Sequence, residues 1–233
     1  MEMMITPLAS SSKANCTHIT NGATQLLLDA GLPVRQLRER LGFGLSKIAA
    51  ALVTHCHKDH CRAVPDLLAA GVDCYMLTST AEECGVLDHH RAHLITAPEV
   101  FTVGTWQVRP FDTPHDVDNI GFLLQSGDEK VLYLTDSPFC RYRFRGLTRI
   151  LIECNYDLPI VNANVEAGVV NPSLKSRVMH NHMNLDTLCD FLRANDLTSV
   201  REIILLHLSD DSSDTEVFKR TIQALTGKAV RIA

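Results

Sequence analysis

The amino-acid sequence predicts an α/β protein in which two β-sheets lie between layers of helices. Apolar segments typical of buried strands alternate with helical segments through two similar halves of the 233 residues. Polar residues gather just past the ends of the predicted strands, where α/β proteins usually build their sites. No linker, repeat or charge block interrupts the alternation, so we expect a single domain over residues 1–233.

The elements of the first half are predicted from apolar segments and the turn residues that separate them. The first strand ends in a glycine turn at Gly31, and the helix after it has Val34, Leu37 and Leu41 at helical spacing. The second strand is apolar and ends where a group of histidines begins. The expected elements are strand 24–31, helix 33–41, strand 48–54, helix 65–70 and strand 74–77.

The second half opens with alternating segments that resemble a meander. Gly104, Gly121 and the turn Ser126-Gly127-Asp128 separate its strands. The last apolar strand ends in a histidine, His207. The expected elements are strands 101–103, 106–110, 120–125, 130–135 and 149–153, helix 185–193, strand 202–207, helix 215–225 and edge strand 229–232.

Charge and composition exclude several classes of protein. The net charge of −5 is opposite in sign to that of a general nucleic-acid coat or membrane-surface protein. No apolar run approaches the roughly 18 residues that a membrane span requires, and Met1-Glu2-Met3-Met4-Ile5 does not resemble a signal peptide. Eight cysteines without a Cys-x-x-Cys pair favour reduced thiols. We therefore expect a cytoplasmic protein.

The strongest functional signal is Thr54-His55-Cys56-His57-Lys58-Asp59-His60, which follows a buried strand. Residues i and i+2 of an extended segment point the same way, so His55 and His57 can bind one metal ion together. Asp59 and His60, on the turn that follows, can face a second ion. Imidazole and carboxylate are ligands for zinc, manganese or iron, and two ions roughly 3.5–4 Å apart form a hydrolytic site. The alternative is a polar loop of solvated histidines.

The pattern His-x-His-x-Asp-His after an apolar strand resembles the metallo-β-lactamase fold superfamily, whose fold is a four-layer αββα sandwich. The resemblance extends over nearly the whole chain. It includes Leu28-Asp29-Ala30-Gly31 before this motif, and Pro114-His115-Asp116, Leu134-Thr135-Asp136 and Leu206-His207-Leu208-Ser209 after it.

The resemblance implies a centre of two divalent metal ions, zinc or manganese, with iron as a further option. The implied ligands of the first ion are His55, His57 and His115. Those of the second are Asp59, His60 and His207, with Asp136 between the two ions.

Three further segments resemble the bacterial YycJ/WalJ-type proteins, which are exonuclease-like relatives of tRNase Z. The resemblance implies phosphodiester hydrolysis, with a nuclease as the leading interpretation and a nucleic acid or nucleotide as the substrate. The segments are Leu8-Ala9-Ser10-Ser11-Ser12-Lys13-Ala14-Asn15, Glu153-Cys154-Asn155-Tyr156-Asp157, and Pro172-Ser173-Leu174-Lys175-Ser176-Arg177-Val178 with His182-Met183-Asn184.

The chemistry of a phosphodiester suits a centre of two metal ions. Two cations can neutralise the nonbridging oxygens and lower the pKa of a bound water from about 15.7 towards about 7. The departing oxygen needs a proton, and the resemblance makes His182 the candidate donor, with Glu153 holding its imidazole. We expect Asp59, His182 and Glu153 to be the catalytic residues. The alternative for His182 is a structural role at the start of the helix after it.

Substrate phosphates need cationic contacts beyond the metal ions. Arg141-Tyr142-Arg143-Phe144-Arg145 interleaves three guanidinium groups with two aromatic rings, five residues after Asp136. Arginine pairs with phosphate and an aromatic ring can stack on a base. A half-buried strand with an exposed basic face would give the same pattern. Lys175 and Arg177 form a second candidate pair for substrate binding.

Other functions stay open at this point. The first alternative is hydrolysis of small cyclic nucleotides, and a weaker one is a thioester or lactone hydrolase of the glyoxalase II-like type. Glu153, His182 and the arginine segment argue against the weaker alternative, because an uncharged ester needs none of them. A metal-stabilised binding protein without activity is the last option. Related phosphodiesterases often dimerise, so a homodimer is possible.

Overall fold

A computed structural model describes residues 3–233, so Met1 and Glu2 of the N-terminal segment considered above lie outside the described residues. The strands form two sheets flanked by helices, which confirms the predicted α/β class. The chain divides into two compact units, one made of Met1–Asp112 and Val117–Asp128, the other of Thr113–Asp116 and Glu129–Ala233. The single domain expected from the sequence stays a prediction.

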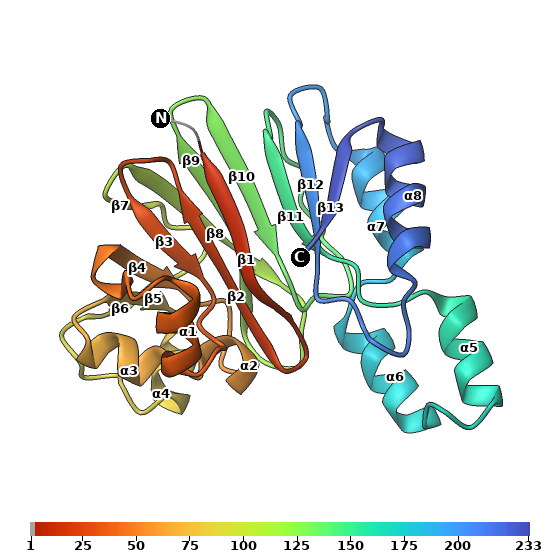
Figure 1. The fold of residues 1–233 in the computed structure, drawn as a ribbon, viewed down its shortest axis with the longest axis horizontal. Helices are drawn as coiled ribbons and strands as arrows, with labels where there is room; N and C mark the ends of the chain where they lie inside the picture. Colours follow the sequence, from red (N-terminus) through yellow and green to blue (C-terminus); the bar gives the residue numbers. More distant parts are fainter. Residues whose placement is uncertain (1–2) are drawn as a thin grey trace. The chain divides into compact units, whose positions relative to one another are not determined.

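The first unit is built on a six-stranded sheet with the strand order β1-β2-β3-β4-β5-β6. The pairs β1–β2 and β2–β3 are antiparallel, whereas β3, β4, β5 and β6 run parallel. Helices α1, α3 and α4 lie beside these strands (Figure 1). The strands are β1 Met4–Ser11, β2 Ala14–Thr20, β3 Gln25–Leu28, β4 Ile48–Leu52, β5 Asp73–Met76 and β6 Ala92–Leu94; the helices are α1 Val34–Arg40, α2 Lys58–Cys61, α3 Val64–Ala69 and α4 Thr78–Glu83.

Burial of apolar side chains explains why these elements form. The parallel strands have nearly continuous apolar sequences, as expected for strands covered on both faces. Leu27 of β3 and Leu37 of α1 belong to one core cluster, together with Leu67 of α3. The strands β7 Phe101–Val103, β8 Trp106–Thr113 and β9 Asn119–Ser126 follow. The indole of Trp106 is fully buried and donates a hydrogen bond to the carbonyl of Thr24.

The second unit contains four parallel strands in the order β13-β12-β11-β10. Helices α7 and α8 lie beside them, and α5 and α6 form a separate helical pair (Figure 1). Because parallel strands present their carboxyl ends at one edge, residues that follow them are brought together. The elements are β10 Glu129–Leu134, β11 Arg149–Glu153, α5 Leu158–Glu166, α6 Pro172–Asn181, α7 Leu185–Ala194, β12 Glu202–Leu206, α8 Thr215–Thr226 and β13 Ala229–Ile232.

The predicted strands and helices are confirmed with small shifts of their ends, but two local predictions are wrong. Asp59 and His60 lie on the one-turn helix α2, not on a turn, since the amides of residues 60 and 61 donate to the carbonyl of His57. The alternative of a strand at residues 141–145 is also wrong, because this segment has no regular structure. The strands β1, β2 and β6 and the helices α4, α5 and α6 were not predicted.

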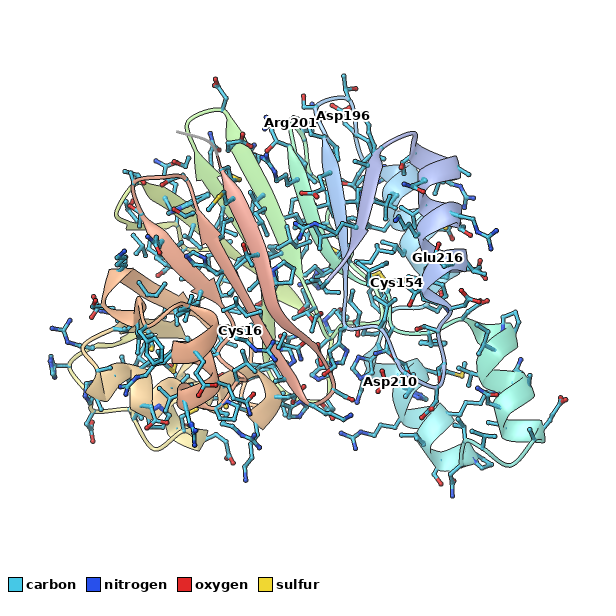
Figure 2. All side chains as sticks on the ribbon, viewed as in Figure 1. Cys16, Cys154, Asp196, Arg201, Asp210 and Glu216 are labelled. Atoms are coloured by element: carbon cyan, nitrogen blue, oxygen red, sulfur yellow. The ribbon has the colours of Figure 1, made fainter. Side chains whose placement is uncertain are left out.

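All eight cysteines lie in the described part of the chain and are free thiols. Cys16 of β2 and Cys154, just past β11, are buried in the two units (Figure 2). Burial raises the pKa of both thiols. Among residues 3–233, no helix has the length and hydropathy needed to cross a membrane.

Candidate metal centre

Three site residues with strained backbone lie one or two residues past the ends of buried parallel strands. Asp29 after β3, Asp136 after β10 and His207 after β12 have positive φ angles of 60°, 49° and 54°. Residues other than glycine rarely adopt this conformation, and such strain often accompanies functional sites. At each position the strained backbone turns a polar side chain out of the apolar strand.

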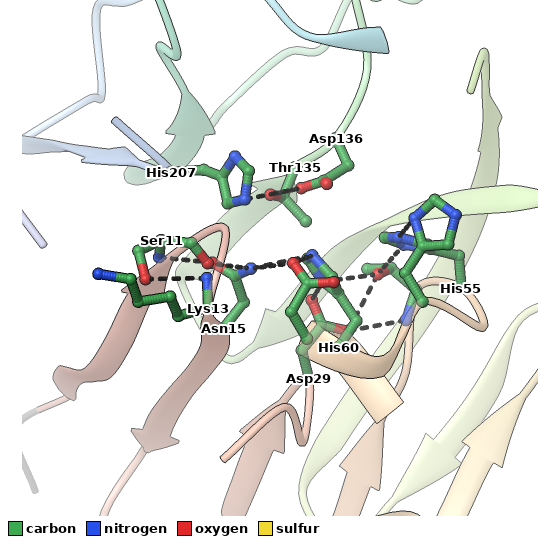
Figure 3. Close-up of polar contacts among 12 residues, drawn as sticks. Ser11, Lys13, Asn15, Asp29, His55, His60, Thr135, Asp136 and His207 are labelled. Atoms are coloured by element: carbon green, nitrogen blue, oxygen red, sulfur yellow. Dashed lines mark hydrogen bonds and ion pairs between the residues drawn. The ribbon is translucent and has the colours of Figure 1, made fainter. Parts of the chain in front are cut away.

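In the first unit, Asp29 organises the histidines that follow β4. The Nδ1–H of His60 donates to Oδ2 of Asp29 over 2.8 Å, and both side chains are fully buried. The other oxygen, Oδ1, accepts hydrogen bonds from the amide and the hydroxyl of Thr54, at 2.9 and 3.0 Å. Figure 3 shows this network around Asp29 and His60.

The hydroxyl of Thr54 extends this network to the histidine pair. Its oxygen accepts a hydrogen bond from Nδ1 of His55 over 2.9 Å, which places Nε2 of that ring 3.1 Å from Nδ1 of His57. A zinc ion bound by two imidazoles holds its nitrogens about 2.0–2.1 Å away, so the nitrogens of a tetrahedral site lie roughly 3.4 Å apart. The spacing of His55 and His57 therefore fits two ligands of one ion.

Asp59 and His60 form a second pair of donors in the same unit. Oδ2 of Asp59 lies 3.3 Å from Nε2 of His60, which again suits two ligands of one ion. The amide group of Asn15, a buried residue of β2, lies 3.2 Å from Oδ2 of Asp59 and 2.9 Å from Nε2 of His60. Asn15 thus contacts both potential metal ligands, although it lies 44 and 45 residues before them in the sequence.

Gly31 allows the segment after β3 to lie close to the backbone of α2. A Cβ atom at this position would lie 1.6 Å from the backbone oxygen of Asp59. The neighbouring amide of Ala30 donates to the carbonyl of His60 over 2.7 Å. The segment after β3 therefore packs directly against α2 and supports the backbone of its donor residues.

In the second unit, the carboxylate of Glu153 holds two imidazole rings. Its Oε1 accepts from Nδ1 of His182 over 2.6 Å and from Nδ1 of His207 over 3.2 Å. Its Oε2 accepts from the backbone amides of Ser137 and Met183, at 3.0 and 3.3 Å. These four hydrogen bonds fix the fully buried carboxylate in one orientation.

The charges of Glu153 and His182 stabilise one another. Burial alone would raise the pKa of Glu153, but the His182 ring beside it lowers that pKa below its usual value. Burial alone would lower the pKa of His182, but the Glu153 carboxylate raises it above its usual value. The rings of His182 and His207 stack with their centroids 5.1 Å apart.

Asp136 completes the group of potential metal ligands in the second unit. Ligand atoms of Asp136, Glu153, His182 and His207 all lie within 4.8 Å of one another. The nearest oxygen of Asp136 is 4.0 Å from Nε2 of His207 and accepts a hydrogen bond from the hydroxyl of Thr135 over 2.6 Å (Figure 3). Because Nδ1 of His207 faces Glu153, its Nε2 faces Asp136, an arrangement that suits a metal-binding ring.

His115 lies in the same unit, within the short segment Thr113–Asp116. Its side chain is almost fully buried, and its Nε2 lies 3.1 Å from Oδ1 of Asp116. The other oxygen of Asp116 accepts from the amide of Asn181, the last residue of α6, over 3.1 Å. The ring centroid of His115 is 6.0 Å from that of His182. The His115 segment is thereby joined to the end of α6.

In the basic segment 141–145 the arginine side chains are exposed and the aromatic rings contact neighbouring side chains. Arg141, Arg143 and Arg145 are exposed, whereas the ring of Phe144 packs against Phe191 of α7, with centroids 6.4 Å apart. The guanidinium of Arg141 lies over the ring of Tyr142 at 5.1 Å. This packing leaves the arginine side chains as the outward-facing part of the segment.

The second basic pair lies on α6, the helix that ends next to His182. The ammonium group of Lys175 donates to Asn162 of α5 over 2.6 Å, and Arg177 is exposed. Lys175 therefore helps to join α5 to α6, and Arg177 presents its charge to solvent.

Several residues of the two groups were missed by sequence reasoning. Asn15, Thr54 and Asn155 were assigned no role, although the amide of Asn155 donates to the carbonyl of His207 over 2.7 Å. Asp29 was identified only as part of a motif. Its position after an apolar strand was a usable signal. Asn15 stood only in a segment of the family resemblance, and its role could not be predicted because its partners lie 44 and 45 residues away.

The donor set fits divalent metal ions. His55, His60 and His207 each direct Nδ1 at a protein oxygen and Nε2 at another potential ligand atom. Imidazoles that bind metals almost always have such a partner on the other nitrogen, since it fixes the tautomer and the ring orientation. Each unit therefore supplies ligands that suit divalent metal ions.

Comparison with known proteins identifies the family. Residues 24–208 match the model described as the beta-lactamase superfamily domain. The chain is 25% identical over 232 residues to exodeoxyribonuclease WalJ of Streptococcus pneumoniae, covering 92% of this chain and 85% of that protein. It is 23% identical over 241 residues to exodeoxyribonuclease YycJ of Bacillus anthracis, covering 95% and 88%.

Solved structures agree with this assignment. The metallo-β-lactamase fold protein YhfI from Bacillus subtilis superposes with a TM-score of 0.77 at 16% identity, covering 99% of this chain and 96% of that one. The short form of human tRNase Z superposes with a TM-score of 0.65 at 16% identity, covering 100% and 96%. The predicted metallo-β-lactamase fold is confirmed, and the chain belongs to the beta-lactamase superfamily.

Proposed function

We propose that this protein is a nuclease of exonuclease type that hydrolyses phosphodiester bonds with two divalent metal ions. His55, His57 and His115 would hold the first ion. Asp59, His60 and His207 would hold the second, with Asp136 between the two ions. The proposal is supported by the donor spacing within each unit and by similarity to two proteins named exodeoxyribonucleases.

The observation that carries the proposal is the anchoring of the donor imidazoles by buried oxygens. Asp29 holds His60 directly and holds His55 through Thr54, while Glu153 holds His207. When bound, two divalent ions would neutralise the nonbridging oxygens of a phosphate and allow water to ionise near neutral pH. The buried carboxylates keep the ligand nitrogens oriented, so the chain contributes preorganised ligands.

His182 would act as the general acid that protonates the departing oxygen. Its Nδ1–H is committed to Glu153 over 2.6 Å, so the proton for the leaving group is carried on Nε2. The side chain retains some exposure, 17%, whereas Glu153 is completely buried. Glu153 is therefore a positioning residue, and His182 is the group that touches substrate.

Cations outside the metal centre would bind the polynucleotide. Arg141, Arg143 and Arg145 are exposed on one segment, and Arg177 is exposed on the helix that ends next to His182. Lys175 would contribute more through its contact with Asn162 than through free charge. With a net charge of −5 for the whole chain, these local cations supply the attraction to phosphate. A cytoplasmic location and a homodimer stay predictions.

A substrate panel tests the proposed activity. The purified protein is supplied with Mn²⁺ or Zn²⁺ and offered labelled single-stranded DNA, RNA, cyclic nucleotides, bis-p-nitrophenyl phosphate and a thioester. We expect stepwise release of nucleotides from DNA and slower hydrolysis of the small diester. The proposal of a nuclease is wrong if a cyclic nucleotide or the thioester is hydrolysed faster than DNA.

The variant His57→Ala tests the proposed centre, and His90→Ala is its matched control. The first replacement removes one proposed ligand, whereas the replacement His90→Ala changes a histidine outside both donor groups. We expect the first variant to lose activity on every diester and the second to keep it. Equal activity of the two variants would mean that the hydrolysis does not take place at the proposed centre.

A further inference from the structure

A cavity in the first unit is lined by residues of β1, β2 and β3, by the end of α1 and by the segment that joins α1 to β4. Its volume is about 310 Å³, at the lower end of the range for small-molecule sites. The residues that line it are Thr6, Leu8, His18, Gln25, Arg40, Leu41, Gly42, Gly44 and Lys47. None of them belongs to the proposed metal centre or to the basic segments discussed above.

The charge of the cavity differs from that of the chain as a whole. Arg40 at the end of α1 and Lys47 just before β4 contribute two cations, and none of the described residues that line it is acidic. The chain as a whole carries a net charge of −5. A hollow with two cations and no carboxylate suits an anion, and guanidinium and ammonium groups together suit a phosphate.

The floor of the cavity offers a hydrogen-bonding edge. Thr6 and His18 are cross-strand partners on β1 and β2, and Nε2 of His18 lies 3.0 Å from Oε1 of Gln25. With Nε2–H donating to that oxygen, Nδ1 of His18 is an acceptor, and the amide nitrogen of Gln25 is a donor. Burial lowers the pKa of His18, which favours this neutral ring. The two lining residues therefore offer one acceptor and one donor, the kinds of group that contact a nucleobase.

Apolar groups flank this edge. Leu8 and Leu41 line the cavity, and Phe43 lies between the two lining glycines, Gly42 and Gly44. Phe43 is 78% exposed and has a φ angle of 59°, a strained conformation for a bulky residue. The ring of Phe43 is thus exposed and next in sequence to two lining residues, and an exposed aromatic ring can stack on a base.

We propose that this cavity is a second ligand site that binds a nucleoside monophosphate. Arg40 and Lys47 contact the phosphate, and His18 with Gln25 contacts the edge of the base. The base lies between the apolar groups of the cavity and the loop that carries Phe43. None of the residues that line the cavity is a proposed metal ligand, so occupancy of this site does not depend on hydrolysis.

Calorimetric titration of the metal-loaded protein with dAMP tests this proposal. The variant Arg40→Ala/Lys47→Ala removes both cations, and Arg35→Ala/Arg38→Ala removes two cations from the same helix without touching the cavity. We expect one dAMP site per chain to weaken at least about tenfold in the first variant and to stay unchanged in the second. Equal affinities in the two variants would overturn the site.

Further ligands and variants test the two halves of the site. Deoxyadenosine and inorganic phosphate should each bind at least about tenfold more weakly than dAMP. Phosphate binding as tightly as dAMP would overturn the assignment to a nucleotide. Gln25→Leu should weaken dAMP while leaving phosphate binding unchanged, and an equal effect on both would contradict the contact with the base.

The His57→Ala variant separates this site from the proposed nuclease centre. Because His57 lies outside the cavity, this variant should retain the dAMP site that Arg40→Ala/Lys47→Ala removes. Loss of all dAMP binding in His57→Ala would show that the nucleotide binds only at the metal centre and would overturn the second site. Failure of the nuclease proposal would leave this result unaffected.

Discussion

His60 and Asp29 form a hydrogen-bonded pair in which both side chains are completely buried, with Nδ1 of His60 2.8 Å from Oδ2 of Asp29. The pair joins the end of β3 to α2, 31 residues further along the chain. A carboxylate in this position fixes the tautomer of the ring and increases the basicity of Nε2. The affinity of the metal centre should therefore depend on a residue that touches no ion.

The variant Asp29→Asn should lower metal affinity by about 10–100-fold, the usual effect of removing such a partner. The amide keeps the size of the side chain but cannot accept from both His60 and Thr54 as a carboxylate does. Competition with a fluorescent chelator measures the affinity, and the exposed Asp88→Asn replacement is the control. Wild-type affinity in Asp29→Asn would show that this pair does not orient a ligand.

His182 should be separable from the metal ligands. The variant His182→Ala should keep both ions and its affinity for DNA, but cleave DNA about 10²–10⁴-fold more slowly, because the leaving group loses its proton donor. A p-nitrophenyl diester needs little protonation and should be much less affected. His180→Ala, an exposed change two residues earlier, is the control.

Glu153→Gln should give the same dependence on leaving group, in milder form, if Glu153 acts through His182. Because Glu153 also contacts His207, this variant should in addition weaken metal binding. Loss of metal from His182→Ala, or an equal slowing of both substrates, would contradict the role of His182 as a proton donor.

The arginine segment should matter more for polymers than for small substrates. Replacing Arg141, Arg143 and Arg145 with alanine should weaken DNA binding and reduce the slope of its salt dependence by up to about 2–3, since fewer counterions are released. Arg193, Lys219 and Arg220 on α7 and α8 provide a control variant of equal charge. Equal slopes in the two triple variants would mean that the segment is only a solvated surface.

Stability at low pH should depend on Glu129. Partial burial alone would raise the pKa of Glu129, but the hydroxyl of Thr148 and the guanidinium groups of Arg201 and Arg149 lower it below its usual value. Arg201 and Glu129 form an ion pair, and Arg149 lies 2.6 Å from the same carboxylate oxygen (Figure 2 shows Arg201). This stabilisation is complete above the unfolded pKa, about 4.3, and is lost as the pH falls through the lower folded value.

Glu129→Gln should therefore lower the free energy of unfolding by about 1 kcal/mol at pH 7. The difference from the wild type should shrink as the pH falls below about 4, because the wild-type carboxylate is then protonated. Urea unfolding at several pH values measures both effects, with the exposed Glu166→Gln as the control. A difference that is independent of pH would contradict this explanation.

The sequence contained enough to predict the fold class and the first donor group. Apolar runs such as Ile48–Leu52 have the length typical of buried strands. His55, His57, Asp59 and His60 lie close together in sequence. Such local patterns predict the structure well, because burial of a strand or helix requires apolar residues along it.

Other features depend on contacts that no local pattern contains. The strands β1 and β2 carry many Ser, Thr and Asn residues, and they are stable because they pair with each other along their length. Asn15 acquires its role only when β2 lies beside α2. The helix α6 has a polar sequence that does not predict a buried face. Tertiary contacts, and not local preference, decide these elements.

Metal content, measured on the purified protein by mass spectrometry, tests the central proposal most directly. We expect close to two divalent ions per chain and the loss of at least one in His55→Ala or His57→Ala, with hydrolysis of DNA falling in parallel. Exhaustive chelation should abolish hydrolysis, and added Mn²⁺ or Zn²⁺ should restore it. A folded protein that still hydrolyses DNA after its metals have been removed would contradict the account.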